Sequence, residues 1–136
     1  GVQTCALPIY GSSSTNATTV DVDAYGNVVI TLADYSDLSS VGGYVRLYAP
    51  TFNDERDFLV VMTADGEYQA MTTKCTHAGG TLRNPSGGLA ICSSHGAEFS
   101  VESGSFGEWQ GGHAASSITP LTVTYDSGAG TLTISA

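Results

Sequence analysis

The sequence predicts an all-β protein built from short antiparallel strands. Three observations lead to this class: β-branched and aromatic residues recur in short runs, turn residues separate the runs, and no stretch has the 3.6-residue apolar period of an amphipathic helix. Short strands with frequent turns are typical of a β-sandwich or a small barrel. We therefore predict one domain of antiparallel sheets.

Nine strands are predicted between residues 19 and 135. They cover residues 19–22, 27–32, 41–49, 57–64, 67–73, 88–92, 97–101, 121–125 and 130–135. The clearest hairpin lies around Asp65–Gly66, because Asp-Gly between two β-rich runs favours a tight turn. The segment DVDAYGN at 21–27 resembles the start of a calcium loop. Because Tyr25 stands at the third ligand position and no glutamate closes the loop, a hairpin turn is predicted there instead.

The N-terminal segment divides into two parts. Residues 1–9, GVQTCALPI, match the translation of a common sequencing adapter, so we interpret them as foreign to the protein. Residues 10–19 follow as a flexible, Ser/Thr-rich leader, and residues 20–136 are expected to form the single domain. A membrane anchor or signal sequence is then expected only in a missing N-terminal part, because no apolar run here approaches the roughly 20 residues of a membrane helix.

Composition restricts the partners. The net charge is −9, which argues against a nucleic acid or an anionic membrane surface as partner. Charged residues make up 12% of the chain, against roughly 25% in an average globular domain, and Gly, Ser and Thr take their place. This composition favours an exported protein on the periplasmic or cell-surface side.

Cysteine and histidine are scarce, yet they occur in two close pairs. Cys75 and His77 lie in KCTHAGG, and Cys92 and His95 lie in CSSHG. Both pairs stand at strand ends and are followed by glycine, so the four side chains can converge on one metal site. One alternative is two buried cysteines beside surface histidines, but buried cysteine gains nothing from a partner histidine. The other is a Cys75–Cys92 disulfide, which leaves the histidines unexplained.

Two thiolates and two imidazoles suit either a tetrahedral zinc ion or a cluster in which histidines replace two cysteines on one iron. Zinc fingers usually place cysteines on one turn and histidines on another. Here each turn supplies one residue of each type, which is the order that a [2Fe–2S] rhombus between two opposed loops needs. The pattern therefore favours the cluster.

The segment C-T-H-A-G … C-S-S-H-G resembles the paired ligand loops of Rieske iron–sulfur proteins, and the resemblance extends over roughly residues 28–136. It implies a Rieske-like fold of antiparallel sheets, with a base β-sandwich and a small cluster-binding subdomain. It also implies one [2Fe–2S] cluster per chain, with Cys75 and Cys92 on the inner iron and His77 and His95 on the outer iron. A third loop, after GEWQGG, is expected to cover the cluster, with His113 near it and Trp109 packed beneath it.

The sequence also departs from one branch of that family. Rieske subunits of cytochrome bc complexes carry a disulfide between the two loops, but the matching positions here are Gly80 and Ser94. Those subunits also have a serine and a tyrosine that donate hydrogen bonds to sulfur, where this chain has Ala97 and Phe99. The resemblance therefore points to the ferredoxin-like members, with a reduction potential low in the roughly −150 to +300 mV Rieske range.

The function expected from these features is one-electron transfer to a redox protein partner, an oxidoreductase or a cytochrome. The alternatives are the soluble head of a membrane-anchored oxidoreductase or cytochrome bc-type subunit, or a redox sensor. The carboxylates form no pair whose spacing suggests acid–base work, and no catalytic residues are assigned. We expect an electron-transfer component of an oxidoreductase system rather than a stand-alone catalyst.

Overall fold

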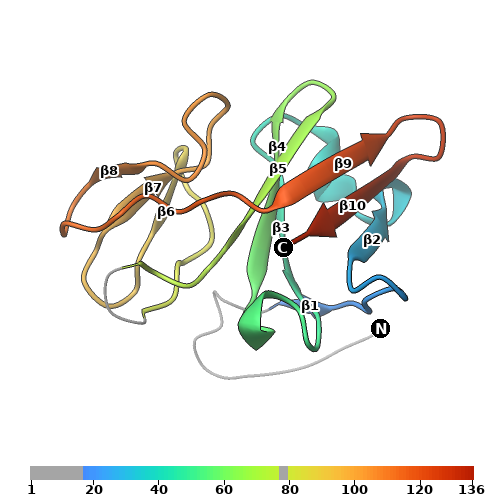
Figure 1. Ribbon diagram of the computed structural model, residues 1–136. Helices are drawn as coiled ribbons and strands as arrows, with labels where there is room; N and C mark the ends of the chain where they lie inside the picture. The colour runs from blue at the N-terminus through green and yellow to red at the C-terminus, as the bar shows by residue number, and fades with distance from the viewer. Residues whose placement is uncertain (1–16, 77–79) are drawn as a thin grey trace.

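The computed structural model describes residues 17–76 and 80–136, which form three small β-sheets (Figure 1). The strands are β1 (Thr18–Thr19), β2 (Val28–Thr31), β3 (Tyr44–Tyr48), β4 (Phe58–Ala64), β5 (Glu67–Thr72), β6 (Leu89–Ile91), β7 (Glu98–Ser100), β8 (Trp109–Gly111), β9 (Thr122–Asp126) and β10 (Thr131–Ser135). Short 3-10 turns occur at η3 (Leu32–Asp34), η4 (Ser36–Ser39) and η5 (Asn53–Glu55). All neighbouring strands pair antiparallel except β1 and β3, which confirms the predicted all-β class.

Two of the sheets form the base of the molecule. One has the strand order β1-β3-β4-β5 and the other β2-β10-β9, and they join where the Leu121 N–H donates to the Ala70 carbonyl at 2.8 Å. The third sheet, β6-β7-β8, lies on the other side of β4 and β5 (Figure 1). Between β7 and β8, the Ser103 hydroxyl donates to Glu67 at 2.7 Å and links the third sheet to β5. No helix in the described residues has the length and apolarity needed to cross a bilayer.

Strand β4 is buried on both faces, because each of its faces belongs to a different core. Phe58 and Val60 pack in the core between the two base sheets, whereas Leu59 and Val61 pack in a second core beneath the third sheet. Successive side chains of a strand point to opposite faces, so an unbroken apolar run is what a central layer requires. The sequence FLVVM therefore forms the middle layer of the molecule.

The structure also differs from the predicted strands in two places. Strand β8 lies in the Gly-rich segment GEWQGG, where no strand was predicted, and β1 ends before Val22. The segment 21–27 forms a turn in which Asp23 Oδ1 accepts hydrogen bonds from the N–H groups of Tyr25 and Asn27, at 2.8 and 3.0 Å. Asp23 thus closes its own hairpin turn, as predicted.

The predicted adapter segment, residues 1–9, lies outside the described residues. Deleting it should leave the thermal unfolding midpoint and the iron content of the protein unchanged, because a translated adapter has no reason to pack against the domain. Calorimetry and iron analysis of the two proteins side by side would check this. A clear fall in either quantity would mean that GVQTCALPI belongs to the protein.

Candidate metal centre

The two Cys/His motifs lie on two hairpin loops that close in the same way. In the first cysteine loop, residues 75–80, the Cys75 N–H donates to the Gly80 carbonyl at 2.9 Å. In the second cysteine loop, residues 92–97, the Cys92 N–H donates to the Ala97 carbonyl at 2.8 Å. Each cysteine therefore occupies the first position of its loop, where the paired backbone fixes it.

The chain between the loops brings them to the same end of the molecule. It leaves the first loop, turns near Ser86 and Leu89, and returns to the second loop as an antiparallel partner. Two hydrogen bonds hold this pairing: Arg83 N–H to the Ile91 carbonyl at 2.8 Å, and Ser93 N–H to the Thr81 carbonyl at 2.9 Å. Alternate turns of a β-meander lie at the same edge, so this topology places the two loops next to each other.

Cys75 and Cys92 meet at the centre of this arrangement. Their exposed fractions are 1% and 2%, and both carry reduced thiols. Burial by itself would raise the pKa of the Cys92 thiol, but hydrogen bonds from the N–H groups of Ser94 and His95, from the Cys75 thiol and from the Ser94 hydroxyl lower it. Donors that favour a thiolate also favour a metal-bound sulfur, so the pair has the chemistry of metal ligands.

Gly80 leaves the space that the two loops need for this approach. A Cβ atom at position 80 would lie 2.6 Å from Cys92 Sγ and 2.6 Å from Ser94 Oγ. It would also lie 2.9 Å from Ser94 Cβ, so positions 80 and 94 face each other. In this chain a close contact between glycine and serine thus stands where the cytochrome bc subunits have their disulfide.

A covering loop, residues 112–118, lies over both cysteine loops. The Thr76 hydroxyl donates to the Ser116 carbonyl at 2.5 Å, and Gly112 packs directly against the Gly96 carbonyl. At the end of the loop, the buried Ile118 donates its N–H to the Gly107 carbonyl at 2.7 Å. The loop is therefore held at both ends and closes the space above the cysteines.

The exposed edge of this region carries two histidines. The rings of His95 and His113 have centroids 5.0 Å apart, and both residues are exposed. Trp109 Nε1 donates to the His113 carbonyl at 3.0 Å, while its side chain is 39% exposed. The expectation that Trp109 packs beneath the covering loop is therefore wrong. Its exposed side chain instead holds the loop from the outside by this hydrogen bond.

The structure places three of the four predicted ligands. Cys75 and Cys92 lie together, and His95 lies on the second loop with its ring at the surface, whereas His77 lies outside the described residues. Within residues 17–76 and 80–136, no three His, Cys, Asp or Glu side chains gather closely enough to hold a metal ion by themselves. The complete set of four ligands remains a prediction.

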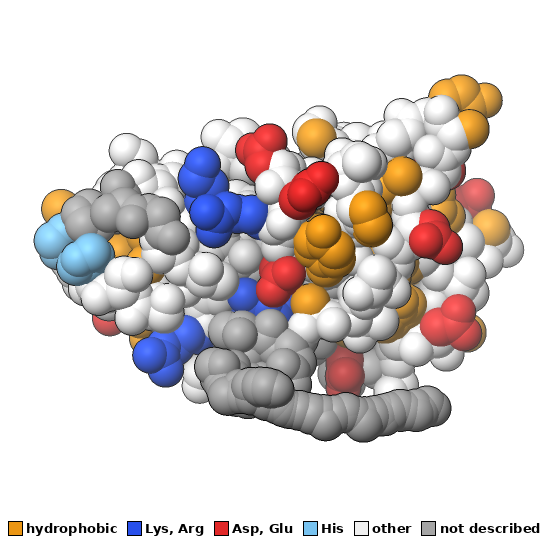
Figure 2. Space-filling model, turned by 90° about the horizontal axis from the view of Figure 1, so that it is seen from below, with side chains coloured by type: hydrophobic (Ala, Val, Ile, Leu, Met, Phe, Trp, Pro, Cys, Tyr) orange, Lys and Arg blue, Asp and Glu red, His pale blue; other side chains and the backbone are white. Residues whose placement is uncertain are grey.

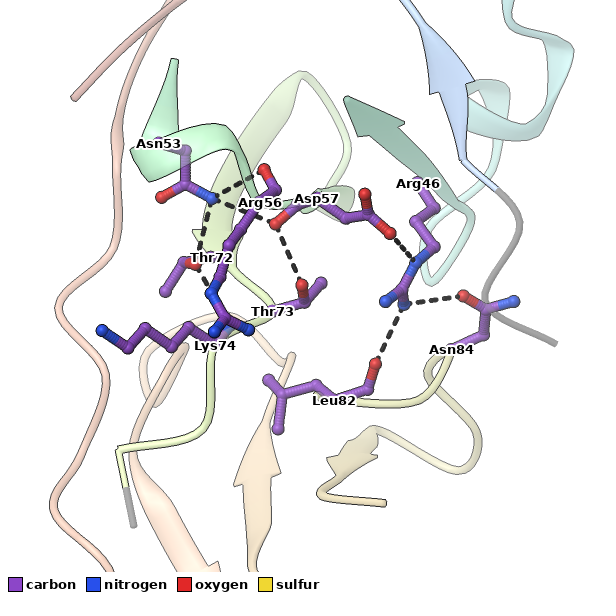
Figure 3. A network of polar contacts seen from close by, with 9 residues as sticks. All are labelled: Arg46, Asn53, Arg56, Asp57, Thr72, Thr73, Lys74, Leu82 and Asn84. Atoms are coloured by element: carbon purple, nitrogen blue, oxygen red, sulfur yellow. Dashed lines mark hydrogen bonds and ion pairs between the residues drawn. The ribbon is translucent and has the colours of Figure 1, made fainter. Parts of the chain in front are cut away.

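Arg46 of β3 lies in a network of polar contacts that reaches the segments flanking the first cysteine loop (Figure 3). In the register of β3 and β4 it stands opposite Leu59, so both face the third sheet. It is 5% exposed, and its Nε donates to Asp57 Oδ2 at 2.9 Å. Its Nη1 donates to the Leu82 carbonyl at 3.0 Å and to Asn84 Oδ1 at 3.3 Å. Sequence analysis missed this residue, although a lone charge inside an apolar strand run was the available signal.

Asp57 and Leu82 carry this support to both sides of the loop. The Asp57 carbonyl accepts from the Thr73 N–H at 3.1 Å and from the Thr73 hydroxyl at 3.0 Å (Figure 3). The Leu82 N–H donates to the Thr73 carbonyl at 2.7 Å. The arginine therefore fixes the chain just before Cys75 and just after Gly80.

A strained turn completes the same network. Asn53, Asp54 and Glu55 have φ values of 55°, 54° and 57°, a left-handed conformation that costs roughly 1–2 kcal/mol per residue outside glycine. This turn points the Asn53 amide at the carbonyls of Arg56 and Asp57 and at the Thr72 hydroxyl, at 3.1, 3.0 and 3.0 Å (Figure 3). These three hydrogen bonds offset part of the strain and hold Asp57 in place.

Charge is distributed unevenly over the molecule. Figure 2 shows Lys and Arg side chains between the histidines at one end and most of the Asp and Glu side chains toward the other. Lys74 and Arg83, both exposed, flank the first cysteine loop. The segment 73–119 contains three of the thirteen carboxylates, and the remaining ten belong to the base.

Residues 33–119 match the family model described as the Rieske [2Fe-2S] domain. The chain belongs to this family of iron–sulfur electron-transfer domains, and its cofactor is a Rieske-type [2Fe–2S] cluster. The buried reduced thiols and the donors around Cys92 fit that cluster. A search of curated protein sequences gave no significant match.

Solved structures of Rieske proteins and ferredoxins share the fold. The plasma membrane Rieske protein PetC3 of the cyanobacterium Synechocystis PCC 6803 is 20% identical, with a TM-score of 0.57 over 78% of this chain and 95% of that chain. The ferredoxin of carbazole 1,9a-dioxygenase from Nocardioides aromaticivorans IC177 is 18% identical, with a TM-score of 0.51 over 79% and 93%. The quaternary ammonium Rieske monooxygenase CntA is 19% identical, with a TM-score of 0.54, and this chain spans only 30% of its length.

Proposed function

We propose that the protein passes single electrons to a redox protein partner and that Cys75, His77, Cys92 and His95 hold its [2Fe–2S] cluster. The observation that carries this proposal is the pair of buried thiols on two hairpin loops, each loop with a histidine of its own. When bound, the cluster accepts and returns one electron. Cys75 and Cys92 exclude water from the inner side, and His95 at the surface keeps the path to a partner short.

The ferredoxin-like form of this function is the one we favour. Gly80 and Ser94 cannot form the inter-loop disulfide of the cytochrome bc subunits, and Ala97 and Phe99 lack the hydroxyls that those subunits have at these positions. Likeness in fold to a dioxygenase ferredoxin supports the same choice. A partner would approach the end that carries His95 and His113, because the base sheets cover the opposite side (Figure 1).

A second candidate function is the soluble head of a membrane-anchored oxidoreductase subunit on the exported side of the membrane. The fold similarity to a plasma membrane Rieske protein favours it. The complete gene distinguishes the two candidates. A membrane helix encoded upstream of Thr18 supports the anchored form, and a start codon directly before the domain supports the free carrier.

Protein purified without oxygen should contain about two irons and two acid-labile sulfides per chain. The reduced protein should give the EPR signal of low average g value that marks mixed Cys/His ligation. Replacing His77 or His95 with serine should abolish that signal. His113→Ser is the matched control, because its ring lies beside His95 without being a proposed ligand, and it should keep the signal. Stoichiometric zinc without sulfide in the wild type would overturn the proposal.

A further inference from the structure

We propose that residues 14–16 of the leader dock as a parallel strand along the free edge of β3 and so extend β1 toward the N-terminus. In the described part of the chain, β1 pairs with β3 through Thr18 opposite Leu47 and Thr19 opposite Tyr48. The described chain begins one residue before this pairing. The inference is independent of the cluster and of the proposed function, because it concerns the base of the molecule.

The first half of β3 has a partner strand on one side. Gly43 directs its carbonyl to β4 and Tyr48 directs its carbonyl to the β1 side, where they accept hydrogen bonds at 3.0 and 2.8 Å. Successive residues of a strand direct their backbone groups to opposite edges, so Tyr44 and Arg46 direct theirs to the β1 side. Pairing with β1 begins at Leu47, so the Arg46 N–H and both backbone groups of Tyr44 face an edge without a described strand.

This edge borders a groove of about 420 Å³. The groove is lined by residues 42–46, by residues 34–37 of the two 3-10 turns, and by Asn84. Thr18 of β1 lines it too, so the groove begins where β1 begins. A strand that continues β1 in the N-terminal direction therefore runs along this groove.

Arg46 also lines the groove, and one of its donors is unused. Its Nε and Nη1 make three hydrogen bonds, whereas its buried Nη2 has no hydrogen-bond partner in the described part of the chain. A buried donor without an acceptor is destabilising. The leader would bring acceptor oxygens to this place, because the register of β1 continued backward sets Thr15 opposite Tyr44, on the face of β3 that carries Arg46.

The leader suits this groove better than a charged or separate segment does. Asp34 and Asp37, both exposed, line the groove and would repel an anionic strand. The sequence GSSSTNATT at residues 11–19 has no charge and is rich in threonine, which favours strands. The leader is also joined covalently to β1, so its effective concentration at the groove exceeds that of a free peptide or a second copy.

Docking in this way would give the chain a fixed exit from the molecule. The leader would cover the unpaired edge of β3, as proteins commonly do with exposed strand edges. Whatever precedes residue 14 would then leave beside Arg46, whose contacts with Asp57 and Leu82 reach the segments flanking the first cysteine loop. The leader is in this proposal a structural strand and not a free linker.

The register specifies which leader residues bond to β3. Val20 donates its N–H to β3, so residues at even positions direct their N–H groups to that strand. Asn16 would donate to the Tyr44 carbonyl and accept from the Arg46 N–H, whereas the Thr15 N–H would point away. Asn16→Pro removes a donor to β3, and Thr15→Pro is its matched control because proline is tolerated where the N–H faces away from the sheet.

Hydrogen exchange followed by mass spectrometry on peptides spanning β3 tests the proposal in the full-length, cluster-loaded protein. Asn16→Pro should speed exchange of the Arg46 N–H about fivefold or more, the change expected from the loss of one hydrogen bond. Thr15→Pro should exchange like the wild type. A chain that starts at residue 17 should exchange as fast as Asn16→Pro or faster. Iron and sulfide content should be equal in all four proteins.

The outcomes identify the occupant of the groove. Faster exchange in Asn16→Pro and in the truncated chain, with Thr15→Pro unchanged, supports docking of the leader. Equal exchange in the two proline variants, or unchanged exchange in the truncated chain, would overturn it. Protection of the Arg46 N–H that rises with protein concentration would assign the edge to a second copy and overturn it as well. Zinc without sulfide in the wild type would overturn the proposed function and leave this inference standing.

Discussion

Arg46→Met should lower the free energy of unfolding by about 3 kcal/mol, the lower end of the cost of breaking a buried ion pair. The substitution leaves the Asp57 carboxylate, the Leu82 carbonyl and the Asn84 amide without their donor. We expect the lower end of that range because the Asp57 side chain is 25% exposed and water can solvate it. Urea unfolding of the cluster-loaded proteins, followed by fluorescence and by cluster absorbance, measures the loss.

Arg56→Met is the matched control for this prediction. It makes the same chemical change at a half-exposed position, and it should cost less than about 1 kcal/mol because exposed charges contribute little. Arg46→Lys keeps the charge but loses the planar fork, so its stability should fall between those of wild type and Arg46→Met. Equal losses for Arg46→Met and Arg56→Met would show that the contacts of Arg46 do not support the loop.

Gly112→Ala should shorten the lifetime of the cluster in air on the order of tenfold or more. Gly112 has a φ of 73°, and a Cβ there would overlap the Gly96 carbonyl in the second cysteine loop. The covering loop would have to lift from that loop, and each 1.4 kcal/mol by which closure is weakened raises the open population tenfold. Bleaching of the visible absorbance after exposure to air measures the lifetime.

Gly104→Ala is the control that separates backbone strain from atomic overlap in Gly112→Ala. Gly104 also has a positive φ, 86°, but a Cβ there would meet no atom within 4 Å. Both variants therefore carry the strain of a left-handed alanine, roughly 1–2 kcal/mol, and only Gly112→Ala carries the overlap. We expect Gly104→Ala to keep a cluster lifetime close to the wild-type value. Equal lifetimes for the two variants would mean that the contact with Gly96 does not protect the site.

The sequence was sufficient to predict the strands and the cysteine loops, because both depend on local patterns. Alternation of apolar runs and turns marks a β-protein, and the spacing of Cys75, His77, Cys92 and His95 is specific even in one sequence. Strand β8 was missed because its segment is rich in glycine, which has low β-propensity, and its position comes from pairing with β7. Local patterns carry no information about such a partner.

Features that depend on tertiary contacts could not be predicted in this way. Arg46 contacts Asp57 and Leu82, which are 11 and 36 residues away along the chain, and no local pattern marks an arginine as their partner.

The uneven distribution of charge makes the protein an electric dipole. Ten carboxylates of the base form the negative pole, and Lys74 and Arg83 beside the first cysteine loop make the histidine end the less negative one. In an approaching partner's field the molecule turns as a whole, with the histidine end toward negative charge, before any contact forms. Salt screens this torque beyond about 8 Å at physiological ionic strength, so orientation by charge operates in the last stage of an encounter.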